Sequence, residues 1–408
     1  MEKIKIVTMP SHILVLDLGT NNIKVLVAQY TNDNWQIVFP ALKKSQGVKQ
    51  GMVENVETVA NNLDDLFDEI SSVNKNFLFK EAVVGLNGPH LETRISKGVS
   101  VISRPDGEIS EDDKERALRT AQSCVLPNNR TLVQTTVKNY IIDSNYKVKD
   151  PSGMKGLRLE VECLLIDAFS MAMRNLNRVS DTLGMKFNYI ITPYAGAEWS
   201  LSNQDKDLGA VAIDLGGGTT GMCVYEEGEL IDLKVFPVGG NNITNDIAVG
   251  LKTYVDIAEK IKLKEGIALA KKVSKGATIN LKDIIENIEE NEDLNFSKKF
   301  VAEIIEARLT EIFDLVGERL KELNRFGKLP GGVILFGGGA LMPYIIDLAK
   351  DRLKLPVRIA KTENNWYQDQ LDSSFVPSLG LLSLTVKNYN TPQLGINFFE
   401  KIKDLFNL

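Results

Sequence analysis

The chain has 408 residues and a mass of 45.3 kDa, with 43% hydrophobic and 25% charged residues, close to the averages for globular proteins. This composition excludes a disordered or fibrous chain, and the length predicts about two to four domains. The 48 basic and 54 acidic residues give a formal net charge of −6, so nucleic acid is not expected as the main partner.

Cysteine and histidine are sparse. Cys124, Cys163 and Cys223 lie far apart and form no CxxC pair, which suits a reducing cytoplasm and predicts no zinc site. His12 and His90 are too few for a histidine metal cluster. Because no apolar stretch is long enough to span a bilayer and the N-terminal apolar run is too short for a signal peptide, we expect a cytoplasmic protein.

A duplicated hairpin is the strongest signal of organisation. Residues 13–29 read ILVLDLGTNNIKVLVAQ, and residues 211–225 read VAIDLGGGTTGMCVY. Each segment has an apolar run, an aspartate (Asp17 or Asp214), a glycine-containing turn with threonine, and a second apolar run. This pattern predicts a β-hairpin with an acidic residue at the end of its first strand. We therefore predict two related halves.

Strands alternate with helices along both halves, which predicts an α/β architecture with largely covered sheets. Apolar spacing and turn residues predict helices at 56–73, 168–183, 239–251 and 300–323, and strands at 82–86, 186–191, 230–237 and 331–336. Between the first hairpin and residue 167, a helix that begins after Ser110 lies between β-rich stretches at 131–142 and 157–167. We interpret 83–166 as a small α+β subdomain inserted in the first half.

The glycine-rich turns fit phosphate binding. Glycine lets backbone N–H groups approach a phosphate closely, and the hydroxyls of Thr20, Thr219 and Thr220 can add donors. Carboxylates cannot bind phosphate directly, but they can hold a hydrated Mg²⁺ that bridges phosphate oxygens. One such turn alone is usually just a turn, whereas two matching copies favour a nucleotide site. The run Gly337–Gly339, after a buried strand, could let a flat base lie against the backbone; neither a P-loop nor a Rossmann fingerprint occurs.

These three turns resemble the phosphate and adenosine loops of the actin/Hsp70/sugar-kinase superfamily. Within it, the chain looks most like the FtsA family of bacterial actin-like cell-division proteins. The strings that carry this resemblance are GMKGLRLEVE (153–162), VGGNNITNDIAVGLKT (238–253), AEKIKLKEGIA (258–268) and IIEARLTEIFDL (304–315). The resemblance implies an α/β, actin-like (ribonuclease H-like, duplicated) fold with two subdomains per half and a C-terminal amphipathic helix.

The resemblance also implies a division of the chain. Residues 1–82 and 167–204 would form subdomain 1A, residues 83–166 the inserted FtsA-type subdomain 1C, residues 205–253 and 327–386 subdomain 2A, and residues 254–326 a helical or mixed subdomain 2B. Residues 387–394 would be a linker to a membrane-targeting helix at 395–408.

By position in the family, the expected ligands are ATP and Mg²⁺. The residues expected to contact the nucleotide are Gly19, Thr20, Asn21, Lys24, Gly216, Gly217, Gly218, Thr219, Gly239, Gly240, Glu259, Lys262, Gly338 and Gly339. Asp17 and Asp214 would hold Mg²⁺ through water and could position the attacking water. Efficient relatives carry Glu or Gln where this chain has Thr192, a poor base, so we expect at most a slow ATPase. Without the resemblance, Glu259 and Lys262 would be an ordinary surface pair at i, i+3.

The last fourteen residues, GINFFEKIKDLFNL, predict an amphipathic helix after the Thr391–Pro392 link. Its apolar residues, spaced by three and four, are Ile396, Phe398, Phe399, Ile402, Leu405 and Phe406. A helix docked on its own domain is the alternative to an interfacial membrane helix. Two lysines are balanced by two acids, so attraction to anionic lipid should be weak. Binding must then rely on apolar burial, which gives several kcal/mol, and on avidity from polymerisation.

Taken together, the resemblance implies an ATP-binding protein that polymerises on the cytoplasmic membrane at the division site, anchors FtsZ filaments there and recruits division proteins. Arg308 matches a position implicated in binding the FtsZ C-terminal tail; its alternative role is an ion pair with Glu303 or Glu311. Two other functions stay open, an FtsA-like pilus-assembly adaptor ATPase and an ASKHA-type kinase. The pilus adaptor should lack the terminal helix, and the kinase would need an acceptor pocket.

Overall fold

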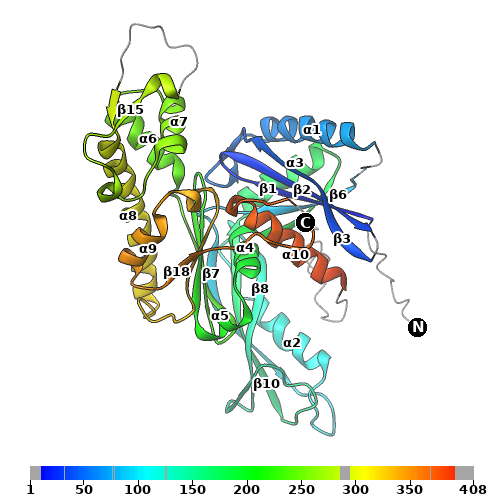
Figure 1. The fold of residues 1–408 in the computed structure, drawn as a ribbon. Coiled ribbons are helices and arrows are strands. Elements are labelled where there is room, and N and C mark those ends of the chain that lie inside the picture. The colour runs from blue at the N-terminus through cyan, green and yellow to red at the C-terminus, as the bar shows by residue number, and fades with distance from the viewer. Residues whose placement is uncertain are drawn as a thin grey trace.

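The computed structural model describes residues 11–284 and 295–390, apart from residues 32, 76, 78, 125 and 368. Two five-stranded sheets form its centre, and a smaller sheet lies at the lower end of the molecule in Figure 1. Within the described ranges, no helix is long and apolar enough to cross a membrane.

The two central sheets have the same topology, which confirms the predicted duplication. The first sheet has the order β11–β6–β1–β2–β3 and the second β14–β13–β12–β17–β18. In each, an antiparallel three-stranded meander is followed by two strands added in parallel. The first-sheet strands are β1 (His12–Leu18), β2 (Asn22–Thr31), β3 (Asn34–Lys44), β6 (Glu81–Leu86) and β11 (Lys186–Ile191). The second-sheet strands are β12 (Ala210–Leu215), β13 (Thr220–Glu226), β14 (Glu229–Phe236), β17 (Gly332–Phe336) and β18 (Val357–Ile359).

Two helices lie between the sheets and join the halves. α10 (Val376–Asn390) packs on the first sheet and α4 (Thr192–Ser200) packs on the second, and the two helices contact each other closely. A side chain at Gly380 would collide with the carbonyl oxygen of Ala195, so glycine permits this approach. The outer faces are covered by amphipathic helices, namely α1 (Val56–Val73) and α3 (Ser170–Thr182) in the first half and α6 (Gly240–Leu251), α8 (Lys298–Glu322) and α9 (Ile345–Leu353) in the second.

The insertion is a four-stranded antiparallel sheet covered by one helix. Its elements are β7 (Glu92–Val101), α2 (Glu111–Gln122), β8 (Arg130–Ile142), β9 (Tyr146–Val148) and β10 (Arg158–Phe169), with the strand order β7–β10–β8–β9. Ser110 and Asp113 form a capping box, so α2 begins where the sequence predicts. The expected boundary at residue 83 falls inside β6, which pairs with β1 and β11, and we therefore propose that the insertion begins after Leu86.

The remaining α-helices and strands lie in both halves, and four short 3₁₀ helices occur at Ala270–Lys272, Leu281–Asp283, Gly338–Leu341 and Ser373–Phe375. The remaining α-helices and strands are α5 (Asn203–Leu208), α7 (Val255–Glu265), the short hairpin of β4 (Val48–Lys49) and β5 (Met52–Val53), and the pair β15 (Thr278–Asn280) and β16 (Asn295–Ser297). The pair β15–β16 adds a small sheet to a region that reads as mostly helical, because three-residue strands leave no periodic signal.

The last described helix is longer than the sequence predicts. α10 continues to Asn390, so the expected linker at 387–394 begins inside a helix. The physical reason is that Val386 and Tyr389 still pack against the core beneath the first sheet. The predicted membrane helix at 395–408 lies outside the described residues.

Candidate nucleotide-binding cleft

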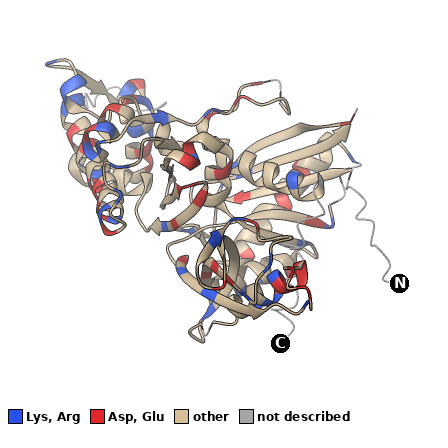
Figure 2. Cartoon of the chain, turned by 90° about the horizontal axis from the view of Figure 1, so that it is seen from below, with Lys and Arg blue, Asp and Glu red and all other residues tan. Residues whose placement is uncertain are grey.

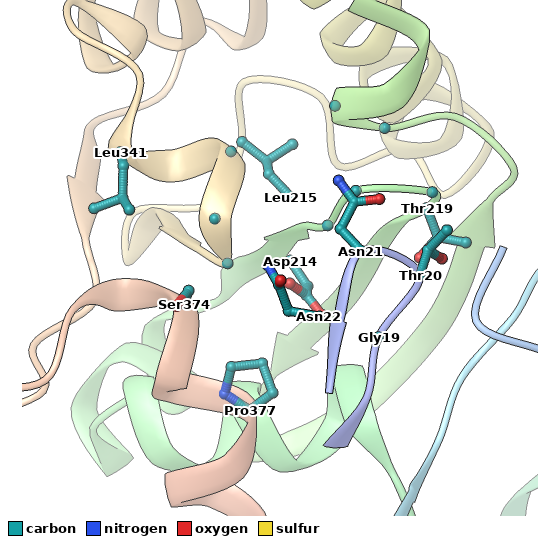
Figure 3. Close-up of a pocket in the computed structure, with 18 of the residues that line it drawn as sticks. Gly19, Thr20, Asn21, Asn22, Asp214, Leu215, Thr219, Leu341, Ser374 and Pro377 are labelled. Carbon is teal, nitrogen blue, oxygen red and sulfur yellow. The ribbon is translucent and has the colours of Figure 1, made fainter. Parts of the chain in front are cut away.

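A cleft of about 400 Å³ lies between the two halves, in the range of small-molecule sites (Figure 3). The β1–β2 turn of the first half and the β12–β13 turn of the second half both line it. The structure brings to this one cleft the residues expected from position in the family, namely Asp17, Gly19, Thr20, Asn21, Lys24, Asp214, Gly216, Gly217, Gly218, Thr219, Gly239, Gly240, Glu259, Lys262, Gly338 and Gly339. The expectation that the Thr220 hydroxyl adds a donor was wrong, because Thr220 is fully buried behind the turn and donates to the Val238 carbonyl at 2.8 Å.

The two duplicated turns touch each other across the cleft. A Cβ atom on Gly217 would lie 2.7 Å from the Asn21 side chain, and one on Gly218 would lie 2.5 Å from the Thr20 hydroxyl oxygen. Both distances are far below van der Waals contact. Glycine at these positions therefore allows the halves to meet, and the turns form one continuous polar wall.

The first residues of α6 are hydrogen-bonded to the β12–β13 turn. The backbone N–H of Gly240 donates to the Gly216 carbonyl at 2.9 Å, and that of Asn241 donates to the Gly217 carbonyl at 2.7 Å. A Cβ on Gly239 would lie 2.6 Å from the Gly216 carbonyl oxygen. The glycine-rich turn is thus braced by backbone contacts, which preorganises it for a ligand.

Two buried carboxylates, Asp17 and Asp214, and the partly buried Lys24 lie at the base of the turns. Lys24 Nζ donates to Asp17 Oδ2 at 2.9 Å, because the two residues face each other in the β1–β2 hairpin. Burial opposes the charge of Lys24, but Asp17 raises the pKa of this amine above its usual value. Burial, and then the neighbouring Asp17, raise the pKa of Asp214 to about 7, although Lys24 acts in the opposite direction.

These charges fit a hydrated Mg²⁺. Asp17 and Asp214 offer the carboxylate oxygens that this ion prefers, and because burial and then Asp17 raise the pKa of Asp214, a bound cation would favour its charged form. Within the described ranges, no group of three or more histidine, cysteine or carboxylate side chains is arranged as a full protein cage for a metal. The arrangement therefore suits an ion that keeps water ligands and shares the oxygens of a bound phosphate.

Glu259 and Lys262 are not a solvated surface pair. Lys262 is 7% exposed, and its ammonium group contacts Glu259 Oε2 at 2.6 Å, Thr244 Oγ1 at 2.8 Å and the Gly240 carbonyl at 3.2 Å. All three N–H donors of the amine therefore have acceptors inside the protein. Lys262 ties α7 to the first turn of α6, while its side chain still faces the cleft.

The opposite end of the cleft is apolar. Its lining comes from α6, α7, α8 and the turn after β17, and the residues are Ile243, Leu263, Leu309, Ile312, Leu341, Met342 and Pro343. Gly338 and Gly339 begin the short 3₁₀ turn that ends at Leu341, and both glycines also line the cleft. A cleft with one polar and one apolar end is complementary to a nucleotide, whose phosphates are charged and whose base is flat and weakly polar.

Several lining residues were not predicted. Asn87 follows β6 and donates to Thr219 Oγ1 at 3.4 Å, and Gly51 donates its backbone N–H to Thr20 Oγ1 at 3.1 Å. Asp372 lines the cleft just before α10. Thr192, already expected at the position where efficient relatives carry Glu or Gln, also lines the cleft, and its buried hydroxyl has no hydrogen-bond partner among the described residues. Such an unpaired hydroxyl in a polar cleft is suited to a ligand or a water.

Arg308 is not among the residues that line the cleft, although its neighbour Leu309 is, and it forms ion pairs with residues of α6 and α8. Its guanidinium contacts both carboxylate oxygens of Asp246 on α6, at 2.7 and 3.0 Å, and also pairs with Glu311. The ion pair with Glu311 was one of the predicted alternatives, whereas the bidentate pair with Asp246 was not predicted.

Comparison with known proteins supplies the family. The model for cell division protein FtsA matches residues 211–380, and the model for the SHS2 domain inserted in FtsA matches residues 88–167. The cell division protein FtsA of Bacillus subtilis is 33% identical over 384 residues, which cover 94% of this chain and 85% of that protein. The chain belongs to the FtsA family of cell-division proteins. FtsA of Neisseria meningitidis serogroup B is 32% identical, covering 94% and 92% of the two chains.

Solved structures agree on the actin-like fold. A PilM–PilN type IV pilus biogenesis complex has a chain that matches with a TM-score of 0.63 at 17% identity, covering 92% of this chain and 98% of that one. MreB5 of Spiroplasma citri bound to ADP matches with a TM-score of 0.56 at 17% identity, covering 94% and 100%. At this identity the likeness shows the fold alone, so it does not favour the pilus-assembly alternative over the family's role in cell division.

Proposed function

We propose that this FtsA-family protein binds ATP with Mg²⁺ in the cleft, polymerises with copies of itself on the cytoplasmic face of the membrane, and anchors FtsZ filaments there, recruiting other division proteins. The observation that carries the nucleotide assignment is the cleft with a polar end made of two duplicated turns and an apolar end made of α6, α7 and α8. The similar fold of MreB5, solved with ADP and with AMPPNP, supports it.

The roles of the residues follow from their places in the cleft. The hydroxyls of Thr20 and Thr219, with the glycine-rich backbone beside them, would hold the phosphates, and Lys24 would offset their charge. Asp17 and Asp214 would hold Mg²⁺, which when bound neutralises phosphate charge. The base would lie against the apolar end.

Hydrolysis should be slow. Thr192 has a free hydroxyl that can hydrogen-bond a water, but a hydroxyl is a poor base near neutral pH. We expect phosphate release from Mg-ATP below about one turnover per second, under the range of efficient phosphoryl-transfer enzymes. Thr192→Glu should raise this rate, and Thr192→Val should not. A wild-type rate well above one per second would contradict the proposal that ATP acts mainly as a structural ligand.

Membrane attachment is assigned to residues 395–408 on their sequence pattern. Five or six large apolar side chains on one stripe would bind a bilayer surface with several kcal/mol. The test is co-sedimentation with liposomes of the full chain, a chain ending at residue 394, and the double variant Phe398→Ser/Phe406→Ser. We expect both changes to release the protein into the supernatant, and unchanged sedimentation would refute the anchor.

An exposed apolar patch near Arg308 is suited to the FtsZ tail. The patch consists of Val249, Tyr254, Val255 and Phe300, which are between 44% and 79% exposed at the meeting point of α6, α7 and α8. Phe300 and Arg308 lie on the same side of α8, since a Cβ on Gly250 of α6 would approach Phe300 and Arg308 pairs with Asp246 of α6. Basic and acidic residues are mixed over these helices, so apolar contact is the main recognition element there (Figure 2).

Binding of a labelled FtsZ-tail peptide, followed by fluorescence anisotropy, tests this patch. Val249→Ser/Tyr254→Ser should weaken binding by at least tenfold, whereas Leu208→Ser, an exposed apolar site on α5, should not. Arg308→Ala should weaken binding and also loosen α8 from α6. If only the thermal stability of Arg308→Ala changes, the arginine is a structural residue and not a contact.

A further inference from the structure

The hairpin of β4 and β5 connects the two halves beside the cleft, which its residue Gly51 lines. Its base belongs to the first half, because Val48 and Val53 are buried in the core and Asn175 of α3 donates to the Val53 carbonyl at 2.9 Å. Its tip contacts the second half, where Gln50 Nε2 donates to the Pro237 carbonyl at 3.1 Å. The β4–β5 hairpin is thus packed into the first half and hydrogen-bonded to the second half.

The tip of this hairpin has an unusual backbone. Lys49 and Met52 are cross-strand partners, so Gln50 and Gly51 form a two-residue loop. Both have positive φ, 48° and 73°, as in a type I′ turn. Asparagine and glycine normally fill the first position, because a longer side chain is uncommon in the left-handed region. Gln50 therefore occupies a position at which the backbone conformation favours a shorter residue.

The same turn lines the polar end of the cleft, where we propose that the phosphates bind. The Gly51 N–H donates to Thr20 in the first glycine-rich turn, and a Cβ on Gly51 would lie 3.1 Å from Asn87. Asn87 in turn donates to Thr219 of the second half. Figure 3 shows Thr20, Asn21 and Thr219 close together at this end.

The segment that Gln50 contacts is itself coupled to the second glycine-rich turn. Pro237 lies between β14 and α6, and the next carbonyl, that of Val238, accepts from Thr220 Oγ1 at 2.8 Å. Gly240 then donates to Gly216. A movement of Pro237 away from Gln50 would therefore carry the second turn with it.

We propose that the Gln50–Gly51 turn is a latch between the two halves that closes the phosphate end of the cleft and limits the rate at which bound nucleotide leaves. The proposal rests on nucleotide binding in the cleft. Gln50 is a positioning residue, since it acts by holding the second half and does not itself line the cleft.

Gln50→Gly is the informative variant. It removes the amide but suits a positive φ, so the hairpin should form as well as in the wild type. Asp33→Gly is the matched control, because Asp33 also has a positive φ, 61°, in the β2–β3 turn of the first half. Losing one hydrogen bond between the halves should speed release of mant-ATP, chased with excess ATP in a stopped-flow instrument, by about twofold to tenfold. Asp33→Gly should leave the rate unchanged.

A measurement without nucleotide separates the latch from the proposed function. Spin labels at Lys44→Cys and Lys260→Cys, in a Cys124→Ser background, report the distance between the halves by double electron–electron resonance. We expect Gln50→Gly to shift or broaden this distribution toward longer distances. If the wild-type protein binds no mant-ATP, the proposed function fails. The latch is then tested only by the spin-label distances between the halves. An unchanged distribution overturns the latch, as does an unchanged release rate in a variant that binds mant-ATP.

Discussion

Replacing Asp214 with asparagine should stabilise the ligand-free protein and weaken its Mg²⁺-dependent binding of ATP. The carboxyl of Asp214 is buried beside Asp17, and its pKa is raised from 3.8 to about 7. The native state therefore disfavours the charged form of a group that ionises freely in the unfolded chain. Asparagine has nearly the same shape and no charge, so it removes this penalty.

The size of the effect follows from the shift. Each pKa unit corresponds to about 1.4 kcal/mol, so the penalty at neutral pH is at most about 4 kcal/mol. Burying an amide in place of a carboxyl also has a cost, so we expect a net increase in the free energy of unfolding of about 1–3 kcal/mol.

The contribution of Asp214 to the free energy of unfolding depends on pH, and its sign can be worked out. Between pH 4 and pH 7 the native state holds the Asp214 proton while the unfolded state has released it, so this group lowers stability as pH rises. Below about pH 4 the carboxyl is protonated in both states and the penalty is absent. Urea denaturation of wild type and Asp214→Asn from pH 4 to pH 8 should show a gap that opens with pH and levels off above about pH 7.

Asp17→Asn is the matched control, because it should change the free energy of unfolding in the opposite direction. Asp17 accepts a hydrogen bond from the partly buried Lys24, so removing the charge of Asp17 leaves the ammonium with a weaker partner and should destabilise the protein at pH 7. Equal and same-signed effects of the two substitutions, or a gap for Asp214→Asn that does not vary with pH, would refute this account of the charges.

Three further predictions concern packing and burial. Gly218→Ala should lower both thermal stability and ATP affinity, measured by differential scanning fluorimetry and calorimetry, because its Cβ would collide with the facing turn. Arg319→Ala should cost about 2–4 kcal/mol in urea denaturation, since it leaves Asp232, 2% exposed, without its bidentate partner. In native protein, Ellman's reagent should react with partly exposed Cys124 well before Cys163, because burial raises the pKa of Cys163 to about 12.

Controls keep these results specific. Gly338→Ala adds a Cβ into open space and should leave thermal stability unchanged. Arg325→Ala breaks a pair with Glu226 in which both side chains are about one-third exposed, and it should cost less than about 1 kcal/mol. If Gly338→Ala is as destabilising as Gly218→Ala, or Arg325→Ala as Arg319→Ala, the argument from contact and burial fails.

The sequence was sufficient for the parts of the site that repeat. The two turns share one local pattern of aspartate, glycine and threonine. This pattern predicted the duplication and placed Thr20 and Thr219 at the polar end of the cleft, but it did not predict that Thr220 is buried. The start of α2 was predictable for the same reason, because a capping box is written in four consecutive residues.

The parts that were not predicted depend on contacts between distant segments. Asn87 and Asp372 reach the cleft only because β6 and α10 pack beside β1, and no local pattern marks them. The pair of Lys24 and Asp17 is different, since the hairpin register places the two residues opposite each other and could have revealed it. For Lys262, the position in the family predicted a contact with the nucleotide. It did not predict that all three N–H donors of the amine have acceptors within the protein.

The most direct test of the central claim, that one nucleotide is held between the two duplicated turns, is isothermal titration calorimetry of ATP into the full chain with and without Mg²⁺. We predict one site per chain, dependence on Mg²⁺, and affinity reduced at least tenfold in both Gly218→Ala and Asp214→Asn. Absence of binding, or binding that neither substitution changes, would contradict the claim.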